Sequence, residues 1–169
     1  MKPREESLDW ATLERALDYD PETGIFRWKQ PRRRVKVGDI TGTPDTHGHL
    51  GITLDGIRYS AHRLAWFYVH KVWPKDEIDH INRVKTDNRI ANLREATHQQ
   101  NMFNTDRRRN NLSGFKGVVR LRREKNNFMA RIQVDGKTIF LGLFPTPEEA
   151  HAAYADASQR YHGKYGRSH

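Results

Sequence analysis

The sequence contains no cysteine, which excludes disulfide bonds and the thiolate zinc sites of zinc fingers, so no zinc is expected. Its longest uninterrupted apolar run covers residues 64–69, far short of the about 20 residues that cross a bilayer. The N-terminal sequence MKPREESLDW lacks the apolar core of a signal peptide. From these absences we expect a soluble cytoplasmic protein without a membrane partner.

Positive charge is abundant instead: 30 Lys and Arg residues oppose 21 Asp and Glu residues, a formal net charge of +9. This excess favours a polyanionic partner, because a basic side chain that neutralises a phosphate releases condensed counterions. Charge alone leaves a merely soluble basic protein as an equal alternative. Residues 103–137 hold ten Lys and Arg against three Asp and Glu, so most of the excess lies in one region.

The first part of the chain predicts a short helix followed by a strand. Ser7 is expected to cap a helix in which apolar residues recur at helical spacing and which ends near Asp18. The sequence DPETG at 20–24 is typical of a turn, and residues 25–28 are typical of a short strand. A basic loop is expected over residues 31–39.

A β-hairpin and a helix are expected next. Asp55 and Gly56 suit a tight primed turn, so residues 49–54 and 57–60 predict the two strands of the hairpin. Apolar residues at helical spacing then predict an amphipathic helix over residues 61–70.

The C-terminal part predicts a separate small domain of class α+β. Three strands are expected, over residues 115–122, 127–134 and 137–144. Asp135-Gly136 joins the last two as a hairpin, and Thr146 caps a helix that ends at Gly163. We expect domains at 1–104 and 113–169, joined by a basic linker at 105–112.

One segment near the end of the first expected domain has the residues that phosphodiester hydrolysis needs: a base, a ligand for a cation and a group that aims the base. Asp79 offers a hard oxygen ligand suited to Mg²⁺, and His80 titrates near neutrality. Asn92 and Asn101 offer amide oxygens, and Asn101 is expected in a helix that begins at His98. An Asp-His pair by itself is usually a surface pair, so the joint spacing carries this interpretation.

The stretch HRLAWFYVH…DEIDHINRVKTDNRIANLREATHQQN resembles the HNH homing endonucleases of phages and mobile introns, over about residues 19–104. The resemblance implies a ββα-metal (His-Me finger) nuclease core. It implies that Asp79 and Asn101 bind one divalent cation, Mg²⁺ or Mn²⁺, that His80 is the general base, and that Asn92 orients His80. Asn101 stands where the family name implies a histidine.

Other polar residues near this segment are expected to have structural roles. Asn82 and Asn88 are assigned to loop structure, because Asn tolerates turn conformations and bonds to nearby backbone. His47 and His49 lie in a glycine-flanked loop where a metal role is not favoured, and His62 is expected to pack or to form a hydrogen bond.

The stretch SGFKGVVRLRREKNNFMARIQVDGKTIFLGLFPTPEEAHAAYADASQRYHGKYG resembles the APETALA2-type DNA-binding domain, over about residues 113–166. The resemblance implies three antiparallel strands backed by one helix, with the sheet facing duplex DNA. The residues expected to contact DNA are Lys116, Arg120, Arg122, Arg131, Gln133 and Phe140, with Arg107, Arg108 and Arg109 of the linker tracking phosphates. Val119 replaces an arginine common in plant members.

Together these features predict a metal-dependent homing-type DNA endonuclease of a phage or its bacterial host, monomeric or dimeric. A second domain would hold it on double-stranded DNA, and no small-molecule cofactor beyond the metal is expected. A catalytically inactive sequence-specific DNA-binding regulator is the alternative. An RNA-binding protein is less favoured, because no aromatic stacking platform is evident.

Overall fold

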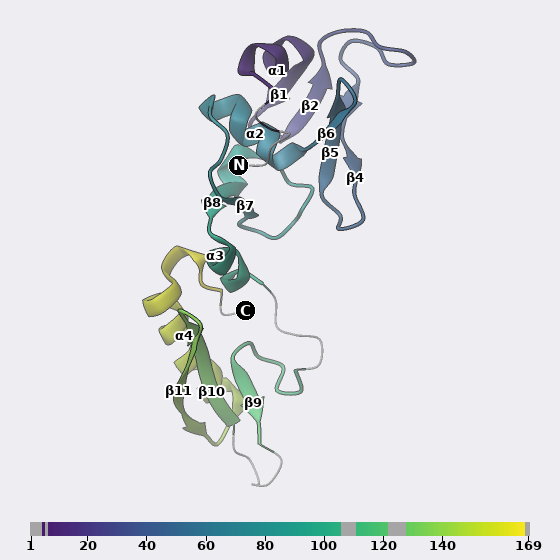
Figure 1. Ribbon diagram of the computed structural model, residues 1–169. Coiled ribbons are helices and arrows are strands. Elements are labelled where there is room, and N and C mark those ends of the chain that lie inside the picture. Colours follow the sequence, from purple (N-terminus) through teal and green to yellow (C-terminus); the bar gives the residue numbers. More distant parts are fainter. Residues whose placement is uncertain (1–4, 6, 106–110, 122–127, 168–169) are drawn as a thin grey trace. The chain divides into compact units, whose positions relative to one another are not determined.

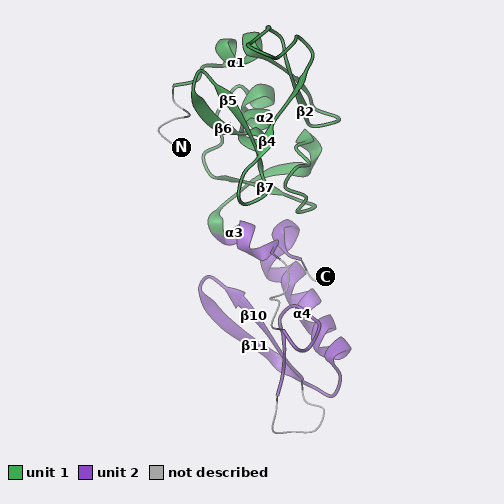
Figure 2. Ribbon diagram, turned by 90° about the vertical axis from the view of Figure 1, so that its right-hand side faces the viewer, with its two compact units in different colours: residues 1–98 green, residues 99–169 purple. Residues whose placement is uncertain are grey.

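The computed structural model describes residue 5 and residues 7–105, 111–121 and 128–167 (Figure 1). The chain divides into two units, residues 1–98 and 99–169, which are described separately below (Figure 2). The predicted boundary at residue 104 therefore lies six residues later than the observed one. The expected DNA contacts of Arg107, Arg108, Arg109 and Arg122 lie outside the described residues.

The first unit begins with helix α1 (Trp10–Ala16). The predicted cap at Ser7 is wrong, because the backbone N–H of Thr12 donates to Asp9 Oδ1 at 2.7 Å and makes Asp9 the cap. The helix ends at Ala16, since Leu17 already has an extended backbone and opens strand β1 (Leu17–Asp20), which the sequence did not predict.

Strand β1 pairs in antiparallel register with the predicted strand β2 (Ile25–Trp28). The two-residue strand β3 (Ile40–Thr41) adds to β2 after the expected basic loop. A second sheet contains β4 (Thr43–Pro44), β5 (Leu50–Leu54) and β6 (Ile57–Ser60).

The turn between β5 and β6 has positive φ at Asp55 (47°) and Gly56 (82°), which confirms the predicted primed hairpin. Helix α2 (Ala61–His70) follows β6 directly, as predicted.

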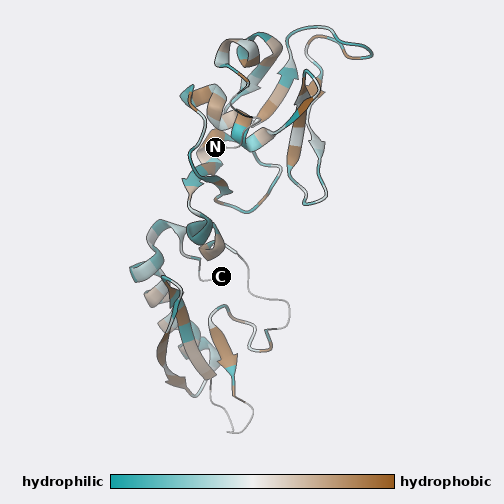
Figure 3. Cartoon of the chain, viewed as in Figure 1, coloured by the Kyte–Doolittle hydropathy of each residue, from teal (hydrophilic) through white to brown (hydrophobic). Residues whose placement is uncertain are grey.

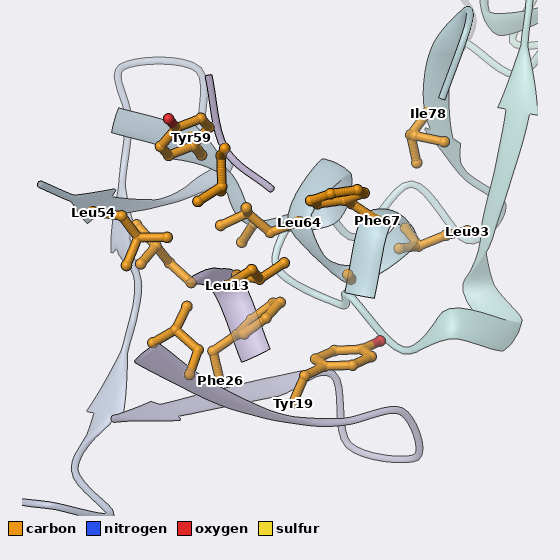
Figure 4. Packing of buried hydrophobic residues seen from close by; sticks show 14 of the residues in the cluster. Leu13, Tyr19, Phe26, Leu54, Tyr59, Leu64, Phe67, Ile78 and Leu93 are labelled. Atoms are coloured by element: carbon orange, nitrogen blue, oxygen red, sulfur yellow. The ribbon is translucent and has the colours of Figure 1, made fainter. Parts of the chain in front are cut away.

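The core of the first unit surrounds α2. Leu13, Leu17 and Leu64 are 0% exposed, and Phe26 and Ile52 are nearly as buried. Figure 4 shows Leu13, Phe26 and Leu64 packed together in this cluster. Each such side chain contributes about 1.5–3 kcal/mol by leaving water, so this packing fixes the unit.

Two further strands follow α2, and the first of them contains Asp79 and His80. Strands β7 (Glu77–His80) and β8 (Leu93–Ala96) form an antiparallel pair, joined by a loop that ends in the 3-10 helix η1 (Ile90–Asn92). A strand ending at His80 was predicted, whereas β8 was not.

Helix α3 (His98–Phe103) has the predicted start and contains Asn101. The second unit continues with β9 (Val118–Arg120), β10 (Phe128–Val134) and β11 (Lys137–Phe144) in the order β11-β10-β9. Helix α4 (Pro147–His162) covers one face of this sheet, and the 3-10 helix η2 (Gly163–Tyr165) follows.

The predicted alternation along β10 is confirmed. Ala130 and Ile132 are 0% and 2% exposed and face α4, where Ala150 is 0% exposed and Tyr154 is also buried. The Thr146 side chain accepts from the Glu149 N–H at 3.2 Å, as the predicted cap requires. Figure 3 shows hydrophobic colouring on strands of both units. None of the described helices is long and apolar enough to cross a membrane.

Candidate active site

Asp79 and His80 lie at the end of β7 and are both buried, at 5% and 4% exposure. Their neighbours differ, because adjacent strand residues point to opposite faces. Asp79 is paired across the sheet with Arg94 of β8, and His80 is paired with Leu93. The carboxylate and the imidazole are thus adjacent in the chain and both buried, but they contact different residues.

The carboxylate of Asp79 is held by Arg94. Arg94 Nε and Nη2 both donate to Asp79 Oδ2, at 2.9 and 2.6 Å. A buried carboxylate needs such compensation, and charge-assisted hydrogen bonds from arginine provide it. A cation at Asp79 therefore shares this carboxylate with a guanidinium.

The predicted metal site has one carboxylate and one amide. Asp79 fits a hard divalent cation in chemistry, because carboxylate oxygens are its preferred ligands. Asn101 lies on α3 in the second unit, so its joint role with Asp79 stays a prediction. Within the described residues, no group of three or more His, Asp or Glu side chains is gathered so that it could hold a metal ion.

His80 is oriented by a side chain to which the sequence assigned only a loop role. His80 Nε2 and Asn88 Oδ1 are 3.0 Å apart, and Asn88 is 1% exposed. An amide oxygen can only accept, so this contact places the imidazole hydrogen on Nε2 and leaves the lone pair on Nδ1. The arrangement presents Nδ1 as the basic atom.

Burial lowers the pKa of His80 below its ordinary value of 6.5, against the raising effects of the Asn88 hydrogen bond and of Asp79. The imidazole is therefore neutral at pH 7. A neutral imidazole is the form that can take a proton from water.

Asn88 is itself fixed by the N-terminal hairpin. The Tyr19 hydroxyl donates to the Asn88 carbonyl oxygen at 2.7 Å, and the Ile90 N–H donates to the Pro21 carbonyl at 3.1 Å. Gly24 has φ +72°, and a Cβ there would lie 2.5 Å from the Asn88 carbonyl carbon. Only glycine allows this approach, so the turn at 20–24 supports the partner of His80.

Asn92 shapes the loop between β7 and β8. Its Oδ1 accepts from the Asn82 N–H at 3.0 Å, and its Nδ2 donates to Asn82 Oδ1 and to the Asp87 carbonyl, at 3.0 and 2.8 Å. These bonds hold the loop that carries Asn88. These contacts of Asn92 thus act on this loop, and its expected orienting role toward His80 stays a prediction.

Two further histidines lie beside His80. The ring centroids of His49 and His62 are 5.8 and 5.2 Å from that of His80, and 5.2 Å from each other. His62 comes from α2 and His49 from the turn before β5. No sequence pattern indicated this cluster, because the three residues are far apart along the chain.

In the second unit, strand pairing separates the residues predicted to contact DNA. Arg131 pairs with Phe140, and both are exposed on the face opposite α4, as is Gln133. Arg120 pairs with Phe128, which places it on the face of the buried Val118. The prediction that Arg120 shares one surface with Arg131 is therefore wrong, because its strand position has the other parity.

Lys116 has a structural role at the end of α3. Its ammonium donates to the carbonyl oxygens of Phe103 and Thr105, at 2.6 and 2.7 Å, at the C-terminal end of α3. Cations are favoured there because the last carbonyls of a helix lack intrahelical partners. The Phe103 ring also stacks on His162, with centroids 3.6 Å apart. A DNA contact by Lys116 stays a prediction.

Comparison with known proteins places this geometry in a class. Residues 59–103 match the family model described as HNH endonuclease. The match contains the end of β6 and all of α2, β7, β8 and α3, and with them Asp79, His80, Asn88 and Asn92. This segment is therefore similar to HNH endonucleases, a family that acts on DNA and generally uses a divalent metal ion.

A particular relative agrees with this class. An uncharacterized HNH endonuclease of Acanthamoeba polyphaga mimivirus is 34% identical over 88 residues, which cover 52% of this chain and 44% of the relative. The chain thus spans less than half of that relative. No solved structure matches the chain. Both comparisons thus find HNH endonucleases as the proteins to which this chain is similar.

Proposed function

We propose that the chain is a metal-dependent endonuclease of the homing type that hydrolyses phosphodiester bonds of duplex DNA. The observation that carries this proposal is the pair of buried residues at the end of β7, within the HNH segment. His80 is held neutral by burial and aimed by Asn88, and Asp79 lies next to it in the chain. A base and an anionic ligand are the groups that metal-assisted hydrolysis requires.

In this proposal His80 Nδ1 takes the proton of the attacking water, while Asn88 holds Nε2–H. Asp79 and Asn101 would hold the cation, Mg²⁺ or Mn²⁺, which when bound stabilises charge on the phosphate and on the leaving oxygen. Arg94 balances the charge of Asp79 before the cation arrives. The products would carry 5′-phosphate and 3′-hydroxyl ends.

The second unit would hold the enzyme on duplex DNA as an APETALA2-like domain. Arg131, Gln133 and Phe140 are exposed on one face of its sheet, and a sheet of this kind can enter the major groove. Arginine and glutamine can then read base edges. The support for this role is the sheet and helix arrangement with this exposed face.

The proposal is tested by digesting a DNA library with the full chain and Mg²⁺ or Mn²⁺, and mapping the ends of the products. Metal-dependent cleavage that EDTA abolishes is expected, with 5′-phosphate ends. Plasmid nicking assays run alongside distinguish cleavage of one strand from cleavage of both. Intact DNA under all metals, with retained DNA binding, would contradict the proposal.

One observation favours the alternative, a DNA-binding regulator without nuclease activity. The guanidinium of Arg94 already occupies Asp79 Oδ2, where it would substitute for a cation in a protein that no longer binds one. An Arg94→Met variant separates the two functions. If the protein is a nuclease, Arg94→Met keeps metal-dependent cleavage or gains metal affinity. If it is a regulator, neither the wild type nor the variant cuts DNA.

A further inference from the structure

The turn at residues 45–49, for which the sequence favoured no metal role, is built around one carboxylate. Asp45 Oδ1 accepts from the backbone N–H groups of His47 and His49, at 2.8 and 2.9 Å, and the Asp45 N–H donates to the His49 carbonyl at 2.7 Å. Gly48 has φ +84° and closes the turn. These bonds fix the backbone of His49, so its ring has a defined place.

That place is beside the proposed base. His80 is 4% exposed, whereas the side chain of His49 keeps 30% of its surface exposed, 5.8 Å away between ring centroids. A substrate that approaches His80 therefore also comes near the ring of His49. The second ring is the part of this cluster that is more open to solvent.

Distances support a contact with the reacting phosphate. The attacking water lies about 3 Å from its base, and the phosphorus lies about 3–3.5 Å beyond the water, so roughly 6 Å separates base and phosphorus. The ring of His49, whose centroid is 5.8 Å from that of His80, therefore lies at a distance from the base comparable to that of the phosphate, as a residue that contacts a phosphate oxygen must.

The charges around His49 also favour an anion. Lys85 Nζ donates to the His47 carbonyl at 2.7 Å and so ties the loop after His80 to the same turn. Burial, Lys85 and His80 lower the pKa of His49, and Asp45 opposes them. Asp45 Oδ1 accepts from two backbone N–H groups and its Oδ2 lies 4.0 Å from His49 Nδ1, so the positive charge of Lys85 on the same turn offsets this carboxylate.

Neighbouring carboxylates are compensated as well. Arg94 holds Asp79, and Arg89 lowers the pKa of Asp87 to about 2 through paired hydrogen bonds of 2.8 and 2.6 Å. Neither carboxylate therefore presents an unbalanced charge that would repel a phosphate here.

We propose that His49 is a substrate-contact residue that donates a hydrogen bond to the phosphodiester at the cleavage site, with Lys85 supplying positive charge beside it. The inference rests on the proposed nuclease function and extends it. The ligand is a phosphodiester of the DNA backbone, and the site consists of the His49 ring and the Lys85 ammonium.

Two substitutions test the contact in the full chain. His49→Phe keeps a ring of similar size but removes the donor, and His49→Asn keeps a short donor. His47→Phe makes the same exchange on the same turn at a ring outside the proposed contact. A lost hydrogen bond to a charged group predicts a roughly 10- to 100-fold lower kcat/KM for His49→Phe, partial recovery for His49→Asn, and no change for His47→Phe.

A modified substrate distinguishes contact from structural support. A duplex carrying a neutral methylphosphonate at the mapped cleavage position removes the charged acceptor. If His49 contacts that phosphate, the losses from His49→Phe and from the methylphosphonate are not additive. Additive losses, or an unchanged kcat/KM in His49→Phe with wild-type thermal stability, would overturn the inference while leaving the nuclease proposal intact.

A binding experiment covers the case in which the wild type does not cut. Nuclear magnetic resonance signals of the His49 ring are followed in EDTA while a short DNA duplex is added, with His70 of α2 as the reference. A shift of His49 larger than that of His70 supports the phosphate contact even where the nuclease proposal has failed. Unchanged His49 signals at saturating duplex would overturn it.

Discussion

The two units use polar side chains in opposite ways. In the first unit, His80, Asn88 and Asp79 are at most 5% exposed, and each is hydrogen-bonded to another side chain. In the second unit, Arg131 and Gln133 stand exposed on a sheet whose other face is buried. Chemistry on water needs a fixed and partly dry group, whereas reading DNA needs groups that reach outward. The difference implies that changes in the first unit affect rate and changes in the second affect binding.

The largest expected effect is the loss of the base. His80→Ala removes the group that takes the proton, so the cleavage rate should fall by about 100- to 10,000-fold, and DNA binding should stay unchanged. Single-turnover cleavage and fluorescence anisotropy with EDTA measure the two quantities. If this variant cleaved DNA at the wild-type rate, the assignment of catalysis to the first unit would be wrong.

Loss of the partner of the base comes next. Asn88→Leu leaves His80 without the acceptor that fixes its tautomer and ring angle, and a misplacement of this kind predicts an about 100-fold lower kcat. Tyr19→Phe removes only the bond to the Asn88 carbonyl and should have a smaller effect in the same direction. Urea unfolding of both variants shows whether the protein is still folded, and a full rate in folded Asn88→Leu would count against the orienting role.

The exposed sheet of the second unit gives a smaller and different effect. Arg131→Ala should weaken DNA binding without changing the single-turnover rate at saturation. If Arg131 contacts a phosphate, the log–log salt slope should fall by about 0.9. Arg120→Ala serves as the matched control, since Arg120 lies on the other face of its strand, and equal losses in both variants would contradict the assigned register.

The smallest expected effect is a shift in pH dependence. Burial lowers the pKa of His80, so the base stays neutral at pH 6.5 and cleavage should decline only at lower pH. The effect of His80 on folding stability runs in the same direction as its effect on cleavage. As pH falls below the pKa of about 6.5 of a histidine in the unfolded chain, the unfolded chain takes up the proton first and stability is lost. A pH–rate profile with its acid limb above pH 6.5 would contradict this assignment.

Local patterns predicted much of the fold. The hairpin at Asp55-Gly56, helix α2 and the alternation along β10 follow from turn residues and periodicity, and all are observed. The two-residue strands β3 and β4 were missed because they are too short to show a period. The cap was assigned to Ser7 instead of Asp9 because both residue types are good N-caps, and the sequence alone does not distinguish them.

The site was predicted less completely. The positions of Asp79 and His80 on a strand end followed from the motif. The role of Asn88 depends on a Tyr19 hydroxyl and a Gly24 turn that lie more than 60 residues away in the chain, as the separation of 69 residues between Tyr19 and Asn88 shows. Contacts between such distant residues leave no periodic signal in one sequence, and the neighbourhood of His49 was hidden for the same reason.

The docking of α3 has a practical consequence for dividing the protein. A polypeptide ending at Asn104 would keep Asn101 but lose His162 and Lys116, which hold the end of that helix. A division after His98 would leave α3 with its partners in the C-terminal fragment but would place Asp79 and Asn101 on different polypeptides. Neither fragment is a fair test of catalysis, so assays of single halves should be replaced by point substitutions in the intact chain.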